Sequence, residues 1–213
     1  MKNSLLDLIM PYNCRGCGKV GDVLCEDCVR KLVRKKITKR QVETDGLFES
    51  VVVVGWREGL LKTLVEEYKF KSVRRMAAIL AELINETLKR DKVKLMEKVY
   101  IVPLPTIGRH IRERGFDHTA RLAKELSKRT GWKVEKALLR RNKTVQVGAN
   151  EEKRLKQAKE AYGLRAGFRP EDGATYVLLD DVWTTGASMR AGAKVLRGAT
   201  QAKIQPIVIE MGK

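Results

Sequence analysis

The stretch from Tyr176 to Ser188 constrains the fold of this chain more than any other part of the sequence. It opens with an apolar run, 176–179, of the kind that forms a buried strand in a parallel sheet. Two adjacent carboxylates, Asp180 and Asp181, come next. A turn rich in hydroxyl groups and small residues, 184–188, then opens a helical pattern. A strand, a tight turn and a helix amino terminus in this order are typical of α/β folds, whose ligands bind at the carboxyl ends of the strands.

The composition of this turn predicts a phosphate site. Backbone N–H groups, the helix dipole and the hydroxyl groups of Thr184, Thr185 and Ser188 can converge on one anion. Gly186 permits a backbone conformation that other residues resist. The adjacent carboxylates would repel a phosphate, but they suit the hydroxyl groups of a sugar or a Mg²⁺ ion. The sequence therefore predicts a ligand with a phosphate at one end and a diol nearby; the alternative is an acidic turn and helix cap without a ligand.

Two common phosphate motifs do not describe this turn. It has neither the Gly-Lys-Ser/Thr of a Walker A loop nor the Gly-x-Gly-x-x-Gly of a dinucleotide fold. It resembles the 5-phosphoribosyl 1-pyrophosphate (PRPP) binding motif of type I phosphoribosyltransferases, which runs from an apolar strand through an acidic pair to Thr-Thr-Gly, a small residue and Ser or Thr. The resemblance implies a ribose 5-phosphate ligand.

All four cysteines lie near the amino terminus, in two Cys-x-x-Cys pairs, Cys14/Cys17 and Cys25/Cys28. Each pair can present two thiolates from one turn, and two pairs make the tetrahedral sulfur site that Zn²⁺ favours. Four thiolates leave no coordination position for a substrate, so we expect a structural zinc ion. The alternative is a pair of disulfides or redox motifs, which is disfavoured because we recognise no secretion signal and no further cysteine.

Apolar periodicity along the rest of the chain alternates between strand and helix. We expect strands at 50–56, 98–102, 134–139, 176–179 and 203–209. We expect helices at 5–9, 29–36, 58–68, 72–90, 120–127, 151–158 and 189–196. This alternation predicts an α/β fold with a mainly parallel sheet flanked by helices, and it places the Pro103-Leu104-Pro105 turn at the same edge as the acidic pair.

The length of 213 residues allows one substantial domain and a small module. We predict a small zinc module built on the four cysteines, with a basic linker, over 1–40 and a phosphoribosyltransferase-like domain over 41–213. No apolar run approaches the ~20 residues of a membrane helix. The stretch from Met1 to Met10 is interrupted by Asp7 and is followed by no small-residue cleavage site. These features predict a cytoplasmic protein without membrane insertion.

A formal net charge of +18 calls for a polyanionic partner or substrate. Basic residues concentrate in 29–40 and 133–159, and the first segment carries Arg30, Lys31, Arg34, Lys35, Lys36, Lys39 and Arg40 without an acid. Single-stranded DNA is therefore a candidate partner. The alternative is a set of solvated side chains that keep the protein in solution.

Several motifs follow one another along nearly the whole chain. They are the four cysteines, Tyr68-Lys69, Val102-Pro-Leu-Pro105, Arg109-x-x-Arg-Glu-Arg-Gly-Phe116, Arg140-x-x-x-Thr144-x-Gln146 and the acidic turn. Together they resemble the ComF family of phosphoribosyltransferase-like proteins, called GntX in some bacteria. The resemblance implies a type I phosphoribosyltransferase fold, binding of PRPP with Mg²⁺, and a link to DNA uptake in natural transformation, with DNA-uptake proteins as candidate partners.

The same resemblance implies roles for individual residues. Asp180 and Asp181 match the acidic pair, and Thr184, Thr185, Gly186, Ala187 and Ser188 match the 5-phosphate loop. The loop that holds pyrophosphate corresponds to Pro103, Leu104, Pro105 and Thr106, and basic positions near it correspond to Lys69, Arg109, Arg112 and Arg114. Arginine binds phosphate through paired hydrogen bonds, which suits a multiply charged ligand. The candidate catalytic residues are Asp180, Asp181 and Arg114.

The chain departs from the family pattern in two places. Asp117-His118 stands where the family often has Asn-Gln, and Arg154 is followed by Gln157 where the family often has Asn. His118 is interpreted as polar filler, with substrate binding or proton transfer as the alternative. Arg140, Thr144 and Gln146 resemble a mobile loop of the family. These differences bear on the acceptor and not on PRPP.

Two functional hypotheses from different classes remain open. In the first, the protein is an enzyme that transfers phosphoribosyl from PRPP to an acceptor, mostly by positioning and electrostatic stabilisation. In the second, it senses PRPP or handles single-stranded DNA with little turnover. Release of pyrophosphate from PRPP separates the two hypotheses.

Overall fold

The computed structural model describes residues 12–34, 46–70, 74–141 and 161–212. Its elements are β1 (Tyr12–Asn13), β2 (Val20–Gly21), α2 (Glu26–Arg34), β3 (Val52–Trp56), α3 (Gly59–Phe70), α4 (Arg74–Arg90), β4 (Val99–Pro103), α5 (Gly108–Arg114), α6 (His118–Thr130), β5 (Lys133–Val134), β6 (Leu138–Arg140), β7 (Tyr162–Leu164), β8 (Thr175–Trp183), α8 (Ala187–Arg197) and β9 (Lys203–Met211).

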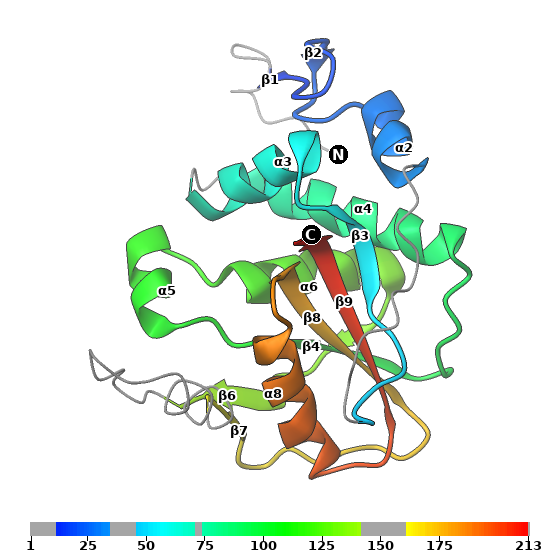
Figure 1. Cartoon of the computed structure of the whole chain (residues 1–213), viewed down its shortest axis with the longest axis vertical. Coiled ribbons are helices and arrows are strands. Elements are labelled where there is room, and N and C mark those ends of the chain that lie inside the picture. Colours follow the sequence, from blue (N-terminus) through cyan, green and yellow to red (C-terminus); the bar gives the residue numbers. More distant parts are fainter. Residues whose placement is uncertain (1–11, 35–45, 71–73, 142–160, 213) are drawn as a thin grey trace.

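Five strands form one sheet in the order β3-β9-β8-β4-β5, and each neighbouring pair is parallel. β8 lies at the centre, between β9 and β4 (Figure 1). The register aligns Pro103, the last residue of β4, with Leu179, and it aligns Val182 with Glu210. The carboxyl ends of three adjacent strands therefore lie at one edge of the sheet.

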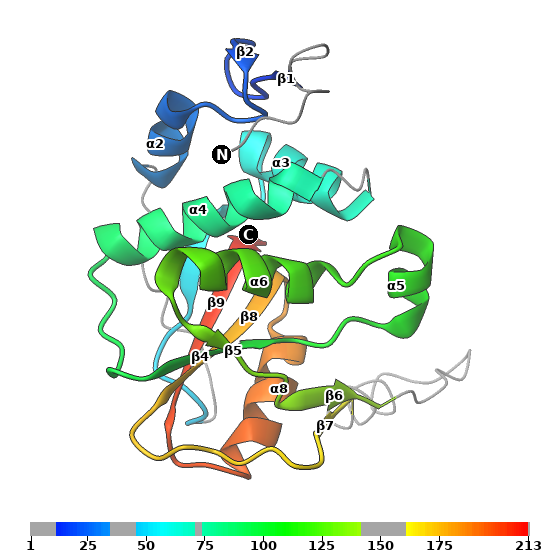
Figure 2. The same ribbon diagram turned by 180° about the vertical axis from the view of Figure 1, so that it is seen from behind.

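Helices cover both faces of this sheet. Figures 1 and 2 show α3, α4 and α6 on one face, and α8 with the β6–β7 pair on the other. Alternating side chains of β3 contribute to both layers. Val52 and Val54 are buried in the cluster that contains the apolar residues of α3 and α4, whereas Val51 and Val53 are buried with those of α8. The run of four valines thus reflects a strand with helices on both sides.

The segment 12–34, here named the cysteine knuckle, consists of β1, β2 and α2. It lies on the outer side of α3 and α4 (Figure 1). Cys14, Leu24, Cys28 and Val33 belong to the same buried cluster as the apolar residues of α3 and α4. The predicted boundary between 1–40 and 41–213 falls outside the described residues and stays a prediction.

The prediction of an α/β fold with a mainly parallel sheet is confirmed. The strand expected at 134–139 is divided between β5, which joins the large sheet, and β6, which pairs antiparallel with β7. Leu138 is buried against α8, on the other side of the sheet from α6, so one apolar run supplies two sheets. Periodicity alone does not distinguish that arrangement from one continuous strand.

The remaining expected elements agree with the observed ones to within a few residues where the structure describes them. The expected helices at 5–9 and 151–158 and the end of the one at 29–36 lie outside the described residues. The sequence did not predict β1, β2, α5 or β7. Within the described ranges, no helix combines the length and apolar character needed to span a bilayer.

Candidate functional site

The carboxyl edge of the sheet brings the two predicted loops together. β8 continues through the acidic pair to Trp183, so Asp180 and Asp181 lie within the strand and not beyond its end. On the neighbouring strand, the backbone N–H of Leu104 donates to the carbonyl of Leu179 at 2.9 Å. The loop after Pro103 therefore starts beside the acidic pair, as predicted from the parallel topology.

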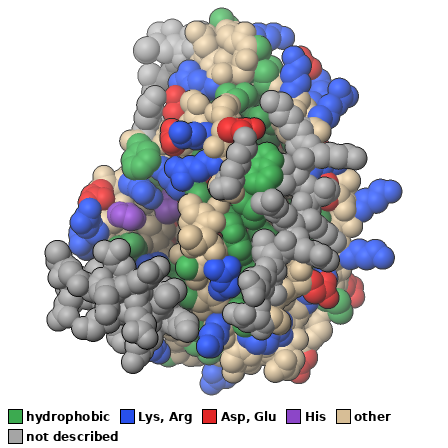
Figure 3. All heavy atoms as spheres, in the orientation of Figure 1, with side chains coloured by type: hydrophobic (Ala, Val, Ile, Leu, Met, Phe, Trp, Pro, Cys, Tyr) green, Lys and Arg blue, Asp and Glu red, His purple; other side chains and the backbone are tan. Residues whose placement is uncertain are grey.

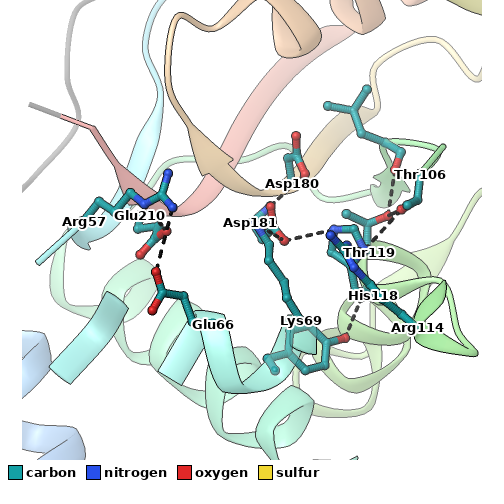
Figure 4. A network of polar contacts seen from close by, with 12 residues as sticks. Arg57, Glu66, Lys69, Thr106, Arg114, His118, Thr119, Asp180, Asp181 and Glu210 are labelled. Atoms are coloured by element: carbon teal, nitrogen blue, oxygen red, sulfur yellow. Dashed lines mark hydrogen bonds and ion pairs between the residues drawn. The ribbon is translucent and has the colours of Figure 1, made fainter. Parts of the chain in front are cut away.

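Asp181 is the centre of a buried charged cluster (Figure 4). Its Oδ2 atom lies 3.1 Å from Lys69 Nζ and 2.9 Å from His118 Nε2, and its side chain is 6% exposed. Burial opposes ionisation, but the hydrogen bond from His118 and the charge of Lys69 outweigh it and lower the pKa of Asp181 to about 2. Asp181 is therefore a carboxylate that already has two partners.

The roles of the two His118 ring nitrogens follow from their neighbours. Arg114 Nη1 lies 3.2 Å from His118 Nδ1, and a guanidinium can only donate, so Nδ1 accepts. Nε2 therefore carries a proton and faces Asp181 Oδ2 at 2.9 Å. Tyr68 fixes the backbone at this position because its hydroxyl donates to the His118 carbonyl at 2.6 Å. The interpretation of His118 as polar filler is thus replaced by a contact with the acidic pair.

Asp180 differs from Asp181 in its exposure, in the direction of its side chain and in its pKa. It is partly exposed, its side chain leaves β8 in another direction (Figure 4), and its Oδ1 accepts a hydrogen bond from the Asp181 backbone N–H at 2.9 Å. Although the residue is partly exposed, its carboxyl group is largely surrounded by protein, and this desolvation together with the charge of Asp181 raises the pKa of Asp180 to about 8. One ligand atom each from His118, Asp180 and Asp181 lies within 4.8 Å of the other two. A cation at this position would lower the pKa of Asp180. Of the two acids, Asp180 is the one that a ligand can reach, because it is partly exposed and Asp181 is buried.

The turn after β8 has the conformation that phosphate loops require. Gly186 has φ 75° and ψ 2°, in the left-handed region, and precedes the first residue of α8. A Cβ there would lie 2.2 Å from Cζ2 of Trp183, so only glycine fits. Thr184, Thr185 and Ser188 are exposed. The guanidinium of Arg190 donates to the Thr185 carbonyl at 2.6 Å and braces the turn. The first-turn N–H groups of a helix have no partner within it and can bind an anion, although the Ala187 N–H already donates to Thr185 Oγ1 at 3.4 Å.

Tyr162 on β7 extends the site and has no counterpart in the sequence-based prediction. Its hydroxyl lies near Ser188 and accepts a hydrogen bond from Arg140 Nη1 at 2.8 Å. Burial raises the pKa of Tyr162, and the nearby carboxyl of Asp180 acts in the same direction. Arg140 is therefore brought to the turn, whereas Thr144 and Gln146 lie outside the described residues. Sequence spacing gives no indication of this contact, because 142–160 separates the two strands.

The predicted basic residues separate into two groups. Lys69 and Arg114 reach the buried cluster around Asp181. Arg109 and Arg112 are exposed on α5, where Arg109 pairs with Glu113 at 2.8 Å. Figure 3 shows histidine side chains at a hollowed part of the surface, with Lys and Arg side chains around it. Two of the predicted basic residues therefore contact the acidic cluster, and the other two lie on the surface outside it.

The loop 103–106 is held mainly through Leu104 and Thr106. The side chain of Leu104 is buried in the core, and its carbonyl accepts a hydrogen bond from Thr119 Oγ1 at 2.7 Å. Thr106 Oγ1 donates to Asp117 Oδ1 at 3.0 Å, and the same oxygen caps α6 by accepting from the Ala120 N–H at 3.1 Å. Leu104 thus positions the loop from within the core.

Glu210, at the end of β9, is a second buried carboxylate at this edge (Figure 4). Its side chain is 1% exposed, and Arg57 Nε lies 3.3 Å from Oε1. Burial raises the pKa of Glu210 to about 7, although Arg57 opposes the shift. Glu210 directly follows the apolar run 206–209, and this acid at the end of a strand was a visible indication in the sequence.

The cysteine knuckle brings its four sulfur atoms together, each within 4.8 Å of the others. Cys25 Sγ lies 3.7 Å from Cys14 Sγ and 3.7 Å from Cys17 Sγ. A tetrahedral site with zinc–sulfur bonds of about 2.3 Å requires sulfur separations of about 3.8 Å. The thiols are free, and backbone N–H groups of Gly16 and Cys25 each donate to Cys14 Sγ at 3.4 Å. The four cysteines thus fit a structural metal site such as the predicted zinc site.

No family model matches this chain. Competence protein F from Haemophilus influenzae is 25% identical to it over 166 residues, which cover 74% of this chain and 71% of that protein. A solved structure described as the allosteric regulatory enzyme of purine biosynthesis matches with a TM-score of 0.37 and 16% identity, over 63% of this chain. The match spans only 25% of the solved chain. The resemblance deduced from the motifs is confirmed at the level of distant homology: this chain is a distant homologue of Competence protein F.

Proposed function

We propose that the protein binds PRPP together with Mg²⁺ at the carboxyl edge of β8 and acts as a phosphoribosyltransferase. The observation that carries the proposal is the pairing of an accessible carboxyl, Asp180, with a glycine turn whose hydroxyl groups are exposed. A phosphate ligand needs the turn, and a ribose diol needs the acid.

In this proposal different residues bind different parts of PRPP. The turn from Thr184 to Ser188 binds the 5-phosphate through N–H and hydroxyl groups. Asp180 accepts hydrogen bonds from the ribose hydroxyl groups and orients the ring. Arg114 and the backbone of Thr106 bind the departing pyrophosphate. Mg²⁺ when bound supplies positive charge to the pyrophosphate oxygens.

The reaction breaks the bond between ribose C1 and the pyrophosphate oxygen and forms a bond from C1 to the acceptor. Pyrophosphate departs with the electron pair of the broken bond. The protein has to hold reactants and stabilise charge, because no covalent intermediate with a side chain is needed. Asp181 takes part indirectly: Lys69 and His118 keep it charged and in place.

Binding of PRPP in the presence of Mg²⁺ tests the first half of the proposal. We expect Asp180→Asn to weaken binding about tenfold or more, because bound Mg²⁺ would keep Asp180 ionised and a lost hydrogen bond to a charged group is worth about 1.5–3 kcal/mol. Titration calorimetry measures the affinity. Asp172→Asn is the matched control, since Asp172 is exposed near the opposite end of β8. Wild-type affinity in the Asp180 variant would contradict the assignment.

Pyrophosphate release tests the second half. Mixtures of nucleobases, amines and hydroxyl-bearing acceptors are offered with Mg²⁺ and PRPP, and pyrophosphate is measured by a coupled assay. A transferase releases pyrophosphate in step with a ribosylated product. Binding without release from any acceptor favours the sensing module.

A second candidate function is the handling of single-stranded DNA. The net charge of +18 and the exposed Lys31 and Arg34 on α2 favour it, as does the name of the homologue, which concerns competence. Arg30 on the same helix is already paired with Asp27 at 2.6 Å. Residues 35–40 lie outside the described part of the chain. We expect charge reversal of Lys35, Lys36, Lys39 and Arg40 to weaken binding and flatten its salt dependence in fluorescence anisotropy; unchanged binding with PRPP affinity intact would remove this candidate.

A further inference from the structure

Three consecutive residues at the end of α3 contact three different parts of the molecule. Glu67 accepts a hydrogen bond from Arg15 Nε at 3.0 Å, in the cysteine knuckle. The Tyr68 hydroxyl donates to the His118 carbonyl at 2.6 Å, and Lys69 Nζ lies 3.1 Å from Asp181 Oδ2. Because the three share one helical turn, a shift at one of them moves the others.

Arg15 stands inside the first cysteine pair, between Cys14 and Gly16. Its backbone N–H donates to the Val23 carbonyl at 2.9 Å, and the N–H of Gly16 donates to Cys14 Sγ at 3.4 Å. The Arg15 side chain therefore leaves from a loop whose shape is set by the cysteine cluster. A metal held by these thiolates would fix that loop.

The contact between the cysteine knuckle and α3 is close. A Cβ on Gly16 would lie 2.7 Å from Cys28 Sγ and 3.0 Å from Cδ2 of Leu60, in the first turn of α3. At the other end of the helix, the Glu67 side chain is 8% exposed and that of Arg15 is 38% exposed. Removing a cationic partner of a buried carboxylate costs stability, so the position of Glu67 is sensitive to that of Arg15.

We propose that Glu67 is a positioning residue that couples the cysteine knuckle to Asp181, so that metal at the cysteines strengthens the binding of the phosphate ligand. The link runs from the cysteine loop through Arg15 to Glu67, along one helical turn to Lys69, and from Lys69 to Asp181. This proposal rests on the proposed function, which identifies the phosphate ligand as PRPP. By linkage the effect is reciprocal, so PRPP raises the affinity for zinc by the same factor.

The affinity of the zinc-loaded protein for PRPP with Mg²⁺ tests the coupling. Arg15→Ala and Glu67→Gln are expected to weaken it about fivefold or more, the lower range of measured coupling between sites. Arg15→Lys keeps the charge and should retain most of the affinity. Metal analysis confirms that each variant still holds zinc, because none of these changes removes a cysteine.

Lys62→Ala is the matched control. It removes an ion pair on the same helix, Lys62 with Glu66 at 3.9 Å, which does not involve the cysteine knuckle. Its PRPP affinity should stay within about a factor of two, as expected for an exposed pair. Equal affinity in wild type, Arg15→Ala and Glu67→Gln would overturn the proposal, and so would an equal loss in the control.

Zinc retention gives a readout without activity. In the wild type, transfer of zinc to a chromogenic chelator should slow when PRPP and Mg²⁺ are present, and this protection should be lost in Glu67→Gln. Protection of the same size in both proteins would count against a role for Glu67.

Hydrogen exchange separates this proposal from the proposed function. Without any PRPP, removal of zinc should speed exchange at the amides of Tyr68 and Lys69, while amides in α8 stay unchanged. If the wild type fails to bind PRPP, the proposed function is wrong, and faster exchange at the end of α3 would still support the link. Unchanged exchange there would end it.

Discussion

Two buried carboxylates at the same edge of the sheet have opposite pKa shifts. The side chains of Asp181 and Glu210 are 6% and 1% exposed, so burial disfavours the charged form of both acids. Asp181 contacts Lys69 and His118 at 3.1 and 2.9 Å, and its pKa falls to about 2. Glu210 has Arg57 at 3.3 Å as its cationic partner, and its pKa rises to about 7. The number and proximity of partners, and not burial, decide which acid stays charged.

The largest expected effect comes from removing the well-partnered acid. Asp181→Asn leaves the Lys69 ammonium without its anion in a mostly buried position. We expect a loss of about 2–4 kcal/mol in the free energy of unfolding, somewhat below the range for fully buried pairs because Lys69 keeps some solvent contact. Urea unfolding at neutral pH measures it. Asp180→Asn, at the accessible neighbour, should change stability by no more than about 1 kcal/mol; equal losses would contradict the comparison.

A smaller effect, of opposite sign, is expected at the poorly partnered acid. The folded pKa of Glu210 is raised from 4.5 to about 7, so the folded state holds its proton longer than the unfolded chain does. The resulting stability is complete below about pH 4.5 and is lost as the pH rises through about 7. Glu210→Gln lacks this loss, so its stability relative to wild type should grow by about 2–3 kcal/mol between pH 4.5 and pH 8.

Thermal or urea unfolding at several pH values measures that difference. A difference between Glu210→Gln and wild type that does not vary with pH would mean that Glu210 is charged in the folded protein at neutral pH. Asp180 contributes equally to both proteins and does not affect the comparison.

The smallest effect is expected where both partners are exposed. Glu66 lies 4.0 Å from Arg57 Nη2, with side chains 44% and 39% exposed. Glu66→Gln should change the free energy of unfolding by less than about 0.5 kcal/mol. A larger loss, measured in the same urea experiment, would show that Glu66 positions Arg57 for its contact with Glu210. Glu66, Arg57 and Glu210 would then act as one ion-pair network.

Local features of this molecule could be predicted from the sequence, since their geometry is set within a few residues. The cysteine pairs and the turn around Gly186 are examples. The contact of His118 with Asp181 depends on how α6 packs on β8, which no local pattern encodes. Leu104 was predicted to belong to the ligand-binding loop, but its side chain is buried in the core.

Side-chain direction limited the prediction of the basic site. Matching Arg109, Arg112 and Arg114 to a motif gives their residue type, but the helical rotation of α5 decides that only Arg114 turns towards His118. The same limit applies to Tyr162, which meets Ser188 because β6 and β7 pair as an antiparallel ribbon. Both contacts depend on tertiary packing.

The close approach of Gly186 to Trp183 has a practical, optical consequence. The indole ring is 6% exposed, and the Arg190 guanidinium lies 5.9 Å from its centroid. An anion bound in the turn would change the electric field at this ring, and we therefore expect it to shift the tryptophan emission. The chain has three tryptophans, and replacing Trp56 and Trp132 with phenylalanine would leave Trp183 as a single fluorophore. The fold has thus placed a native reporter directly beneath the turn, and ligand arrival can be followed by stopped flow without any added dye.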